Sequence, residues 1–132
     1  MLNGIIPASQ SSNIQAALRI MTGLLFLTHG LTKLFNWPAT DYFPAGQALP
    51  PLMLVAGIIE LVGGILIVLG LFTRLTAFIL AGMMAVAYFM AHMPSSFFPI
   101  QNGGEAAILF CFVFLFLAAA GAGSYSLDAS RK

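Results

Sequence analysis

The stretch that decides the fold is LMLVAGIIELVGGILIVLGL, residues Leu52–Leu71, in which Glu60 is the one charged residue. An apolar run of this length suffices for an α-helix that crosses the hydrocarbon core of a bilayer. A carboxylate at that depth is costly unless it is protonated, paired or facing water. Small residues share one helical face with Glu60, namely Ala56, Gly57, Gly63 and Gly64. They predict that another helix packs closely over the acid, which then points into protein rather than lipid.

The composition of the whole chain supports the same membrane class. The chain has 132 residues and a mean hydropathy of +0.97, with 60% hydrophobic and 7% charged residues. A soluble domain carries about 25% charged residues, so this chain has too few to cover itself with a hydrated surface. We therefore expect an integral membrane protein in contact with the lipid bilayer, with one domain over residues 1–132. A net charge of +1 gives no basis for nucleic-acid binding.

Several kinds of site are excluded by what the sequence lacks. Cys111 is the single cysteine, so the chain can form neither an intrachain disulfide nor a C-x-x-C redox pair. His29 and His92 are the only histidines, and neither belongs to a metal-binding motif, so no metal site is predicted. The sequence shows no haem, flavin or iron–sulfur motif either.

Four apolar segments have the length of membrane spans. They cover residues 17–35, 52–71, 75–92 and 106–123. Only Phe72–Arg74 separates the second from the third, which predicts a tight helical hairpin. We expect an all-α membrane protein, folded as an antiparallel four-transmembrane-helix bundle.

The basic residues predict how this bundle is oriented. Arg19, Arg74, Arg131 and Lys132 fall on the side of the termini and the short turn, whereas Lys33 lies near the opposite face. The positive-inside rule then places both termini in the cytoplasm. Asp128 and the two terminal basic residues are expected to form a solvated tail.

Polar residues are predicted to meet inside the bundle. Arg19, Thr22, Phe26, His29 and Lys33 have spacings of three and four, which place them on one face of the first helix. His29 and Glu60 come out at nearly the same depth, so Glu60 is expected to pair with His29 or with Lys33 reaching inward. Arg19 lies in the other half of the membrane and, like Arg74, is interpreted as a structural polar residue.

A second group of polar residues is expected near the outer ends of the third and fourth helices. His92 ends the third helix and Tyr88 lies one turn deeper on the same face. Asn102 and Glu105 open the fourth helix, where an acidic side chain favours the positive end of the helix dipole. Each of these residues also has a structural explanation, as hydrogen-bonding groups within the fold or as anchors at the membrane surface.

These residues give the chain a resemblance to the DoxX family of small bacterial membrane proteins. The resemblance rests on motifs spread over nearly the whole length: Arg19, Gly23, Gly30 and Lys33; Glu60-Leu-Val-Gly63-Gly64 with Gly70 and Arg74; His92; Asn102-Gly103-Gly104-Glu105; and Gly121-Ala-Gly123-Ser-Tyr-Ser126-Leu127-Asp128. It implies a multi-pass protein of the bacterial inner (cytoplasmic) membrane. It also implies a link to membrane redox complexes, although direct dithiol exchange is disfavoured by the lack of a cysteine pair.

Three functions are consistent with this sequence. The first is a quinone-linked redox subunit that works with a redox partner protein. Glu60 and His29 would be its catalytic residues, and Lys33, Tyr88, His92, Asn102 and Glu105 would bind the quinone, which is the one cofactor expected. The second is a small proton, cation or solute transporter, for which a homo-oligomer is one arrangement. The third is a membrane scaffold or assembly partner without chemistry of its own.

Overall fold

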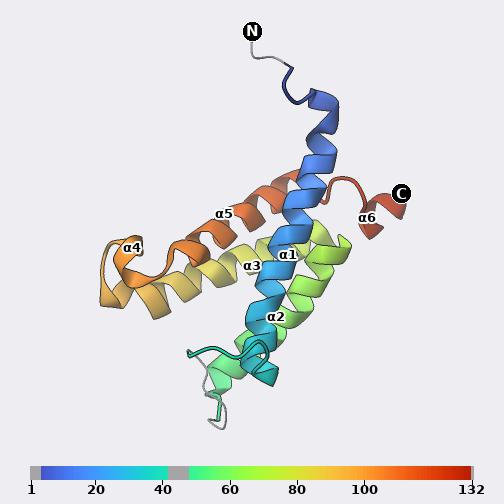
Figure 1. The fold of residues 1–132 in the computed structure, drawn as a ribbon. Coiled ribbons are helices and arrows are strands. Elements are labelled where there is room, and N and C mark those ends of the chain that lie inside the picture. Colours follow the sequence, from blue (N-terminus) through green and yellow to red (C-terminus); the bar gives the residue numbers. More distant parts are fainter. Residues whose placement is uncertain (1–3, 42–47, 132) are drawn as a thin grey trace. The chain divides into compact units, whose positions relative to one another are not determined.

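The computed structural model describes residues 4–41 and 48–131, and all regular structure in these ranges is helical (Figure 1). The chain divides into two compact units, Met1–Phe72 with Ala122–Lys132, and Thr73–Gly121. Three helical segments are long and apolar enough to cross a membrane, and a fourth, shorter apolar helix accompanies them. The prediction of an all-α membrane protein is confirmed. The four-helix bundle as a single domain over residues 1–132 stays a prediction.

The first unit is built on two long helices that lie side by side (Figure 1). A short 3₁₀ turn, η1 (Ala8–Gln10), leads into α1 (Ser11–Phe35), and α2 spans Pro51–Leu69. Proline suits the first position of α2 because a helix leaves that N–H without an internal partner. Gly70 ends α2 with φ of +66°, and its N–H and that of Leu71 bond back to the last turn.

Glycines set the close approach of α1 and α2. A Cβ atom added at Gly30 would lie 2.7 Å from the backbone nitrogen of Leu61 and 2.8 Å from the carbonyl oxygen of Gly57. Nearer the other end, Gly23 faces Gly64 and Val68 in the same way. Since residue numbers rise along α1 as they fall along α2, the two helices are antiparallel. Small residues are what allow spanning helices to pack backbone against backbone.

The second unit pairs α3 (Thr73–Ala87) with α5 (Glu105–Ala120). The helical path of α3 continues through a π-helical turn, η2 (Tyr88–His92), and a 3₁₀ turn, η3 (Met93–Ser95). A single helical turn, α4 (Pro99–Asn102), then leads into α5. The buried apolar side chains of the second unit come from both α3 and α5: Ala77, Leu80, Ala81, Met84, Ala107, Phe114 and Leu117.

The structure corrects three of the predicted helix boundaries. The first helix begins at Ser11 rather than residue 17, because a helix can extend its polar end beyond the apolar core of a membrane. The second stops at Leu69, where Gly70 adopts the left-handed conformation that closes a helix. The fourth ends at Ala120 instead of residue 123, since Gly121 has φ of +89° and leaves the helical path.

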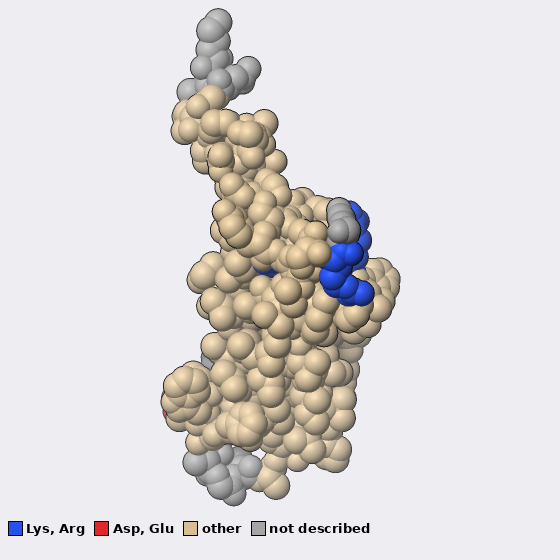
Figure 2. Space-filling view, turned by 90° about the vertical axis from the view of Figure 1, so that its right-hand side faces the viewer, with Lys and Arg blue, Asp and Glu red and all other residues tan. Residues whose placement is uncertain are grey.

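All four long helices expose large apolar side chains. Leu25 on α1, Val62 on α2, Phe78 on α3 and Phe112 on α5 are each more than half exposed. The face drawn in Figure 2 is uncharged over most of its area, and its basic groups are largely gathered in one place. Exposed apolar faces of this extent would be unfavourable in water and suit contact with lipid.

The C-terminal segment belongs to the first unit. After Gly121 the chain leads into α6 (Leu127–Ser130), whose N-cap residue Ser126 accepts a hydrogen bond from the backbone N–H of Ala129 at 3.0 Å. Lys132 lies outside the described residues.

Candidate functional site

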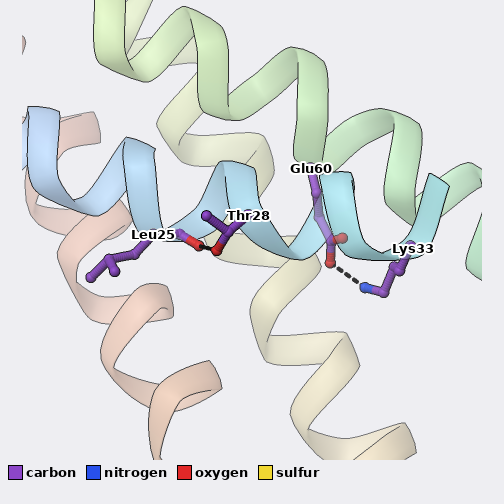
Figure 3. Close-up of polar contacts among 4 residues, drawn as sticks. All are labelled: Leu25, Thr28, Lys33 and Glu60. Carbon is purple, nitrogen blue, oxygen red and sulfur yellow. Dashed lines mark hydrogen bonds and ion pairs between the residues drawn. The ribbon is translucent and has the colours of Figure 1, made fainter. Parts of the chain in front are cut away.

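The first unit contains an ion pair between its two long helices. Glu60 projects from α2 toward Lys33 on α1 (Figure 3), and Lys33 Nζ lies 2.5 Å from Glu60 Oε1. Only 11% of the Lys33 side chain and 4% of the Glu60 side chain are exposed. Of the two partners predicted for Glu60, the structure therefore supplies Lys33. A pair this buried replaces the water that each charge would otherwise bind.

The packing around this pair explains how the two charges reach each other. Gly57 lies one turn before Glu60, and a Cβ atom added there would be 3.2 Å from the Lys33 Cβ and from the side chain of Leu34. The predicted close packing of a helix over the acid is confirmed. Glu60 Oε2 is also buried, and it has no hydrogen-bond partner among the described residues. One carboxylate oxygen of the pair is thus available for a further donor.

His29 does not join the buried face of α1. The buried residues nearest to it, Phe26 and Gly30, continue a stripe with Arg19 and Gly23 at spacings of three and four, whereas His29 is exposed. At about 100° per residue, His29 lies roughly 100° away from Gly30 around the helix. His29 thus lies off the face of α1 that meets α2, because the glycines set that face, and its orientation toward the interior of the bundle stays a prediction.

Arg19 forms a separate polar centre in the same unit. Its side chain is fully buried and donates from Nη1 to the carbonyl oxygens of Ala122 at 2.5 Å and Ser124 at 3.1 Å. Nη2 donates to the carbonyl oxygen of Tyr125 at 2.8 Å. About fourteen residues separate Arg19 from Lys33, which is about 21 Å along a helix. Arg19 therefore holds the C-terminal segment and takes no part in the ion pair.

Asp128 strengthens the attachment of this segment. Its Oδ1 accepts a hydrogen bond from the backbone N–H of Phe72 at 2.8 Å, and its own N–H donates to the carbonyl oxygen of Gly70 at 2.9 Å. The prediction of a solvated tail was wrong for Asp128, which closes the end of α2. The signal that could have revealed this is Ser126, which begins a short helix two residues before Asp128. Arg131 is exposed, as predicted for this tail.

In the second unit, Tyr88, His92 and Asn102 lie together. Asn102 is buried, and its Nδ2 donates to the Tyr88 hydroxyl at 3.1 Å and to the carbonyl oxygen of Ser96 at 3.0 Å. Its Oδ1 accepts the N–H of Gly104 at 2.7 Å. The carbonyl oxygen of Asn102 lies 3.1 Å from His92 Nδ1. The predicted grouping of these three residues is therefore present, with the Asn102 amide engaged inside the protein.

The remaining two predicted residues of this unit are exposed. Glu105 is the first residue of α5, the position where its charge favours the helix dipole. Arg74 donates hydrogen bonds to the carbonyl oxygens of Ala119 and Ala120, which are among the last of α5 and would otherwise lack partners. Neither joins the cluster around Asn102 by a hydrogen bond. No group of three or more His, Cys, Asp or Glu residues in the described ranges is placed to hold a metal ion.

The sequence model of the DoxX family matches residues 14–93. The chain belongs to the DoxX family. This DoxX protein is 48% identical over 98 residues to an uncharacterized protein of Haemophilus influenzae, covering 72% of this chain and 73% of the relative. It is 40% identical over 65 residues to the Bacillus subtilis protein named "Putative oxidoreductase CatD", covering 48% of each chain. No solved structure gives a significant match.

The part of this DoxX protein that matches the family contains the ion pair and part of the second cluster. Residues 14–93 include Lys33 and Glu60 as well as Tyr88 and His92, whereas Asn102 lies beyond the matched range. The family thus identifies the chain as a membrane protein of this kind, and its chemistry has to be inferred from the geometry.

Proposed function

We propose that this DoxX protein is a quinone-binding membrane subunit of a redox system, with Lys33 and Glu60 as its binding groups. The observation that carries the proposal is the buried Lys33–Glu60 pair, whose Glu60 Oε2 has no partner among the described residues. Polar groups at such depth are costly in a membrane protein and are commonly functional. The name of the Bacillus subtilis relative, which shares 48% of its length with this chain, supports a redox role.

A bound quinone would supply the redox chemistry, taking two electrons and two protons to become a quinol. The electrons would come from a two-electron donor in a partner protein, such as a reduced flavin. Lys33 can donate a hydrogen bond to a carbonyl oxygen of the ring, and Glu60 can hold and release a proton beside it. The surrounding apolar helices exclude water, which strengthens both interactions.

The experiment compares quinone binding by the wild type and two variants in mild detergent. Bound quinone is extracted and quantified, and the protein is then titrated with a short-chain quinone. Glu60→Gln and Lys33→Met remove one member of the pair each, and we expect each to weaken binding at least about tenfold. Thr28→Val is the matched control on α1, since its hydroxyl bonds to the carbonyl oxygen of Leu25 in its own helix (Figure 3).

Circular dichroism of each variant separates loss of binding from loss of structure. The proposal is supported if the variants keep their helical content and lose the quinone while Thr28→Val binds normally. Wild-type protein with no extractable quinone and no saturable binding would refute it. A proton or cation flux into liposomes that depends on Glu60 would instead identify a transporter.

We further propose that both termini face the cytoplasm in the inner membrane of a bacterium. Arg19, Arg74 and Arg131 belong to the side of the termini and of the short α2–α3 turn in the sequence topology, against Lys33 near the other side. Basic residues near the ends of spans are retained on the cytoplasmic side during insertion.

A further inference from the structure

The cluster around Asn102 fixes the orientation of two side chains that can exchange protons. The rings of Tyr88 and His92 lie at the two ends of the π-helical turn η2, with centroids 6.4 Å apart and planes inclined by 27°. Asn102 bonds to the Tyr88 hydroxyl through its amide and to His92 through its carbonyl oxygen. π-helical turns are rare and are often found at functional sites.

The hydrogen bonds from Asn102 determine what each ring can still offer. A carbonyl oxygen can only accept, so His92 Nδ1 must carry the hydrogen that it shares with Asn102. In the neutral imidazole this leaves a lone pair on Nε2. The Tyr88 oxygen accepts the Asn102 amide, so its own hydrogen points elsewhere. The cluster therefore presents one acceptor and one donor, and neither has a hydrogen-bond partner among the residues that the structure describes.

The turn at Asn102–Gly104, just before α5, holds Tyr88 and His92 in these orientations. A Cβ atom added at Gly104 would lie 2.6 Å from Tyr88 Cε2, so only glycine lets the ring lie against this turn. Asn102 uses both side-chain polar atoms inside the protein, which explains why it is buried. Holding the loop accounts for Asn102 and Gly104. It does not account for an imidazole and a phenol that are aligned and half-buried with unused polar atoms.

We propose that Tyr88 and His92 bind the hydroxyl group of a phenolic ligand. A phenolic oxygen can donate its hydrogen to His92 Nε2 and accept the hydrogen of Tyr88, so that one group meets both requirements. Phenols are stronger hydrogen-bond donors than alcohols, which suits an imidazole acceptor. An aromatic ring can also pack against exposed Phe89, which already makes an edge-to-face contact with Tyr88 at 5.4 Å between centroids.

Two sources could deliver such a hydroxyl group, the reduced form of a membrane quinone or a free phenol from water. This proposal rests on other residues than the proposed quinone site, because none of them belongs to the unit that contains Lys33 and Glu60. Its test measures binding of a hydroxyl group at His92. The Lys33–Glu60 test measures binding of an oxidised quinone, so the failure of one proposal can be told from the failure of the other.

The experiment uses the full-length protein, labelled with ¹⁵N at histidine, in detergent micelles. Only two histidines give signals, and His29→Gln assigns them. The probes are 4-propylphenol and 4-propylanisole, which differ in the hydroxyl hydrogen. We expect the free protein to show His92 protonated at Nδ1, and the phenol to shift the His92 Nε2 signal saturably. The anisole should leave that signal in place, and His29 should respond to neither probe.

Variants test the donor separately. Tyr88→Phe keeps the ring and removes the hydroxyl, so we expect affinity for 4-propylphenol to fall about fivefold, the effect of one hydrogen bond. Phe112→Leu, at an exposed position of α5, should bind as the wild type does. Equal effects of the phenol and the anisole would refute the proposal, and so would an unmoved His92 signal or His92 protonated at Nε2. If Tyr88→Phe leaves affinity unchanged, Tyr88 is not the donor and the proposal fails.

A last arm identifies the source of the ligand once binding is found. A short-chain hydroquinone and the matching quinone are titrated anaerobically. Tighter binding of the hydroquinone than of 4-propylphenol assigns the site to a membrane quinol, and weaker binding assigns it to a free phenol. A quinone that binds as tightly as its hydroquinone would overturn the proposal, since it has no hydroxyl hydrogen to donate.

Discussion

Replacing Lys33 by methionine should expose how much the fold depends on the buried ion pair. Methionine is unbranched and only slightly shorter than lysine, but it leaves Glu60, 3% exposed, without the ammonium 2.5 Å away. Removing one partner of a buried pair costs about 3–5 kcal/mol in proteins generally. A charge at the centre of a spanning helix costs about 2.5–3.5 kcal/mol on insertion scales. Because Lys33 keeps some exposure, we expect a loss of about 3 kcal/mol in the free energy of unfolding.

The measurement is reversible unfolding in mixed micelles with increasing dodecyl sulfate, followed by the helical circular dichroism signal. A double variant, Lys33→Met with Glu60→Leu, removes both charges and should lose only about 1 kcal/mol, because no buried charge is left unpaired. Thr28→Val on the same helix should stay within about 0.5 kcal/mol of the wild type. If the double variant is destabilised as much as Lys33→Met or more, or if Lys33→Met is as stable as the wild type, the charges do not interact as described.

Three further predictions concern packing, the C-terminal segment and orientation. In the same unfolding assay, Gly30→Ala should lower the free energy of unfolding by about 1–3 kcal/mol, because its Cβ would meet backbone atoms of α2. Gly82 has nothing within 4 Å of an added Cβ, so Gly82→Ala should be neutral or stabilising by up to about 1 kcal/mol. Asp128→Ala should free the C-terminal segment, which limited proteolysis would detect as faster cleavage after residue 121, at a cost of about 1 kcal/mol; unchanged cleavage would contradict the attachment. In a cysteine-free background, Ser95→Cys should react with a membrane-impermeant maleimide in intact spheroplasts and Ser130→Cys only after permeabilisation, and the reverse pattern would overturn the orientation.

The helices could be predicted from the sequence because many consecutive residues of each span are apolar. Apolar runs of membrane-spanning length are interrupted by few polar residues, so their existence is clear even where their ends are not. The errors fall at the ends. Gly70 and Gly121 stop their helices by adopting positive φ, although apolar residues follow directly, Leu71 and Phe72 after Gly70 and Ala122 after Gly121. The sequence contains these glycines, but many other glycines of the chain lie inside helices, so their identity alone does not mark an end.

The candidate site was only partly predictable from the sequence. Residue spacing shows which side chains share a face of a helix, but it does not show which of them lies nearest to the neighbouring helix. Residues at spacings of three and four include both His29 and Lys33, and either could have met Glu60. The choice depends on Gly23 and Gly30, which bring α1 against α2 along a line that leaves His29 outside. The partners of Arg19 could not be foreseen either, since they are carbonyl oxygens more than a hundred residues away in the chain. Every residue has a backbone carbonyl oxygen, so the sequence does not show which of them will accept a hydrogen bond from an arginine.

That Glu60 pairs with Lys33 instead of histidine changes how the proposed site would work. A closed ion pair has no net charge, and each of its members compensates the buried charge of the other. A ligand oxygen that takes a hydrogen bond from Lys33 competes with Glu60 for the same ammonium hydrogens. The carboxylate would then lose part of its compensation, which is costly for a charge buried in a membrane protein. In the proposed site, ligand binding and the charge of Glu60 would be linked through Lys33, because Oε2 has no other partner among the described residues.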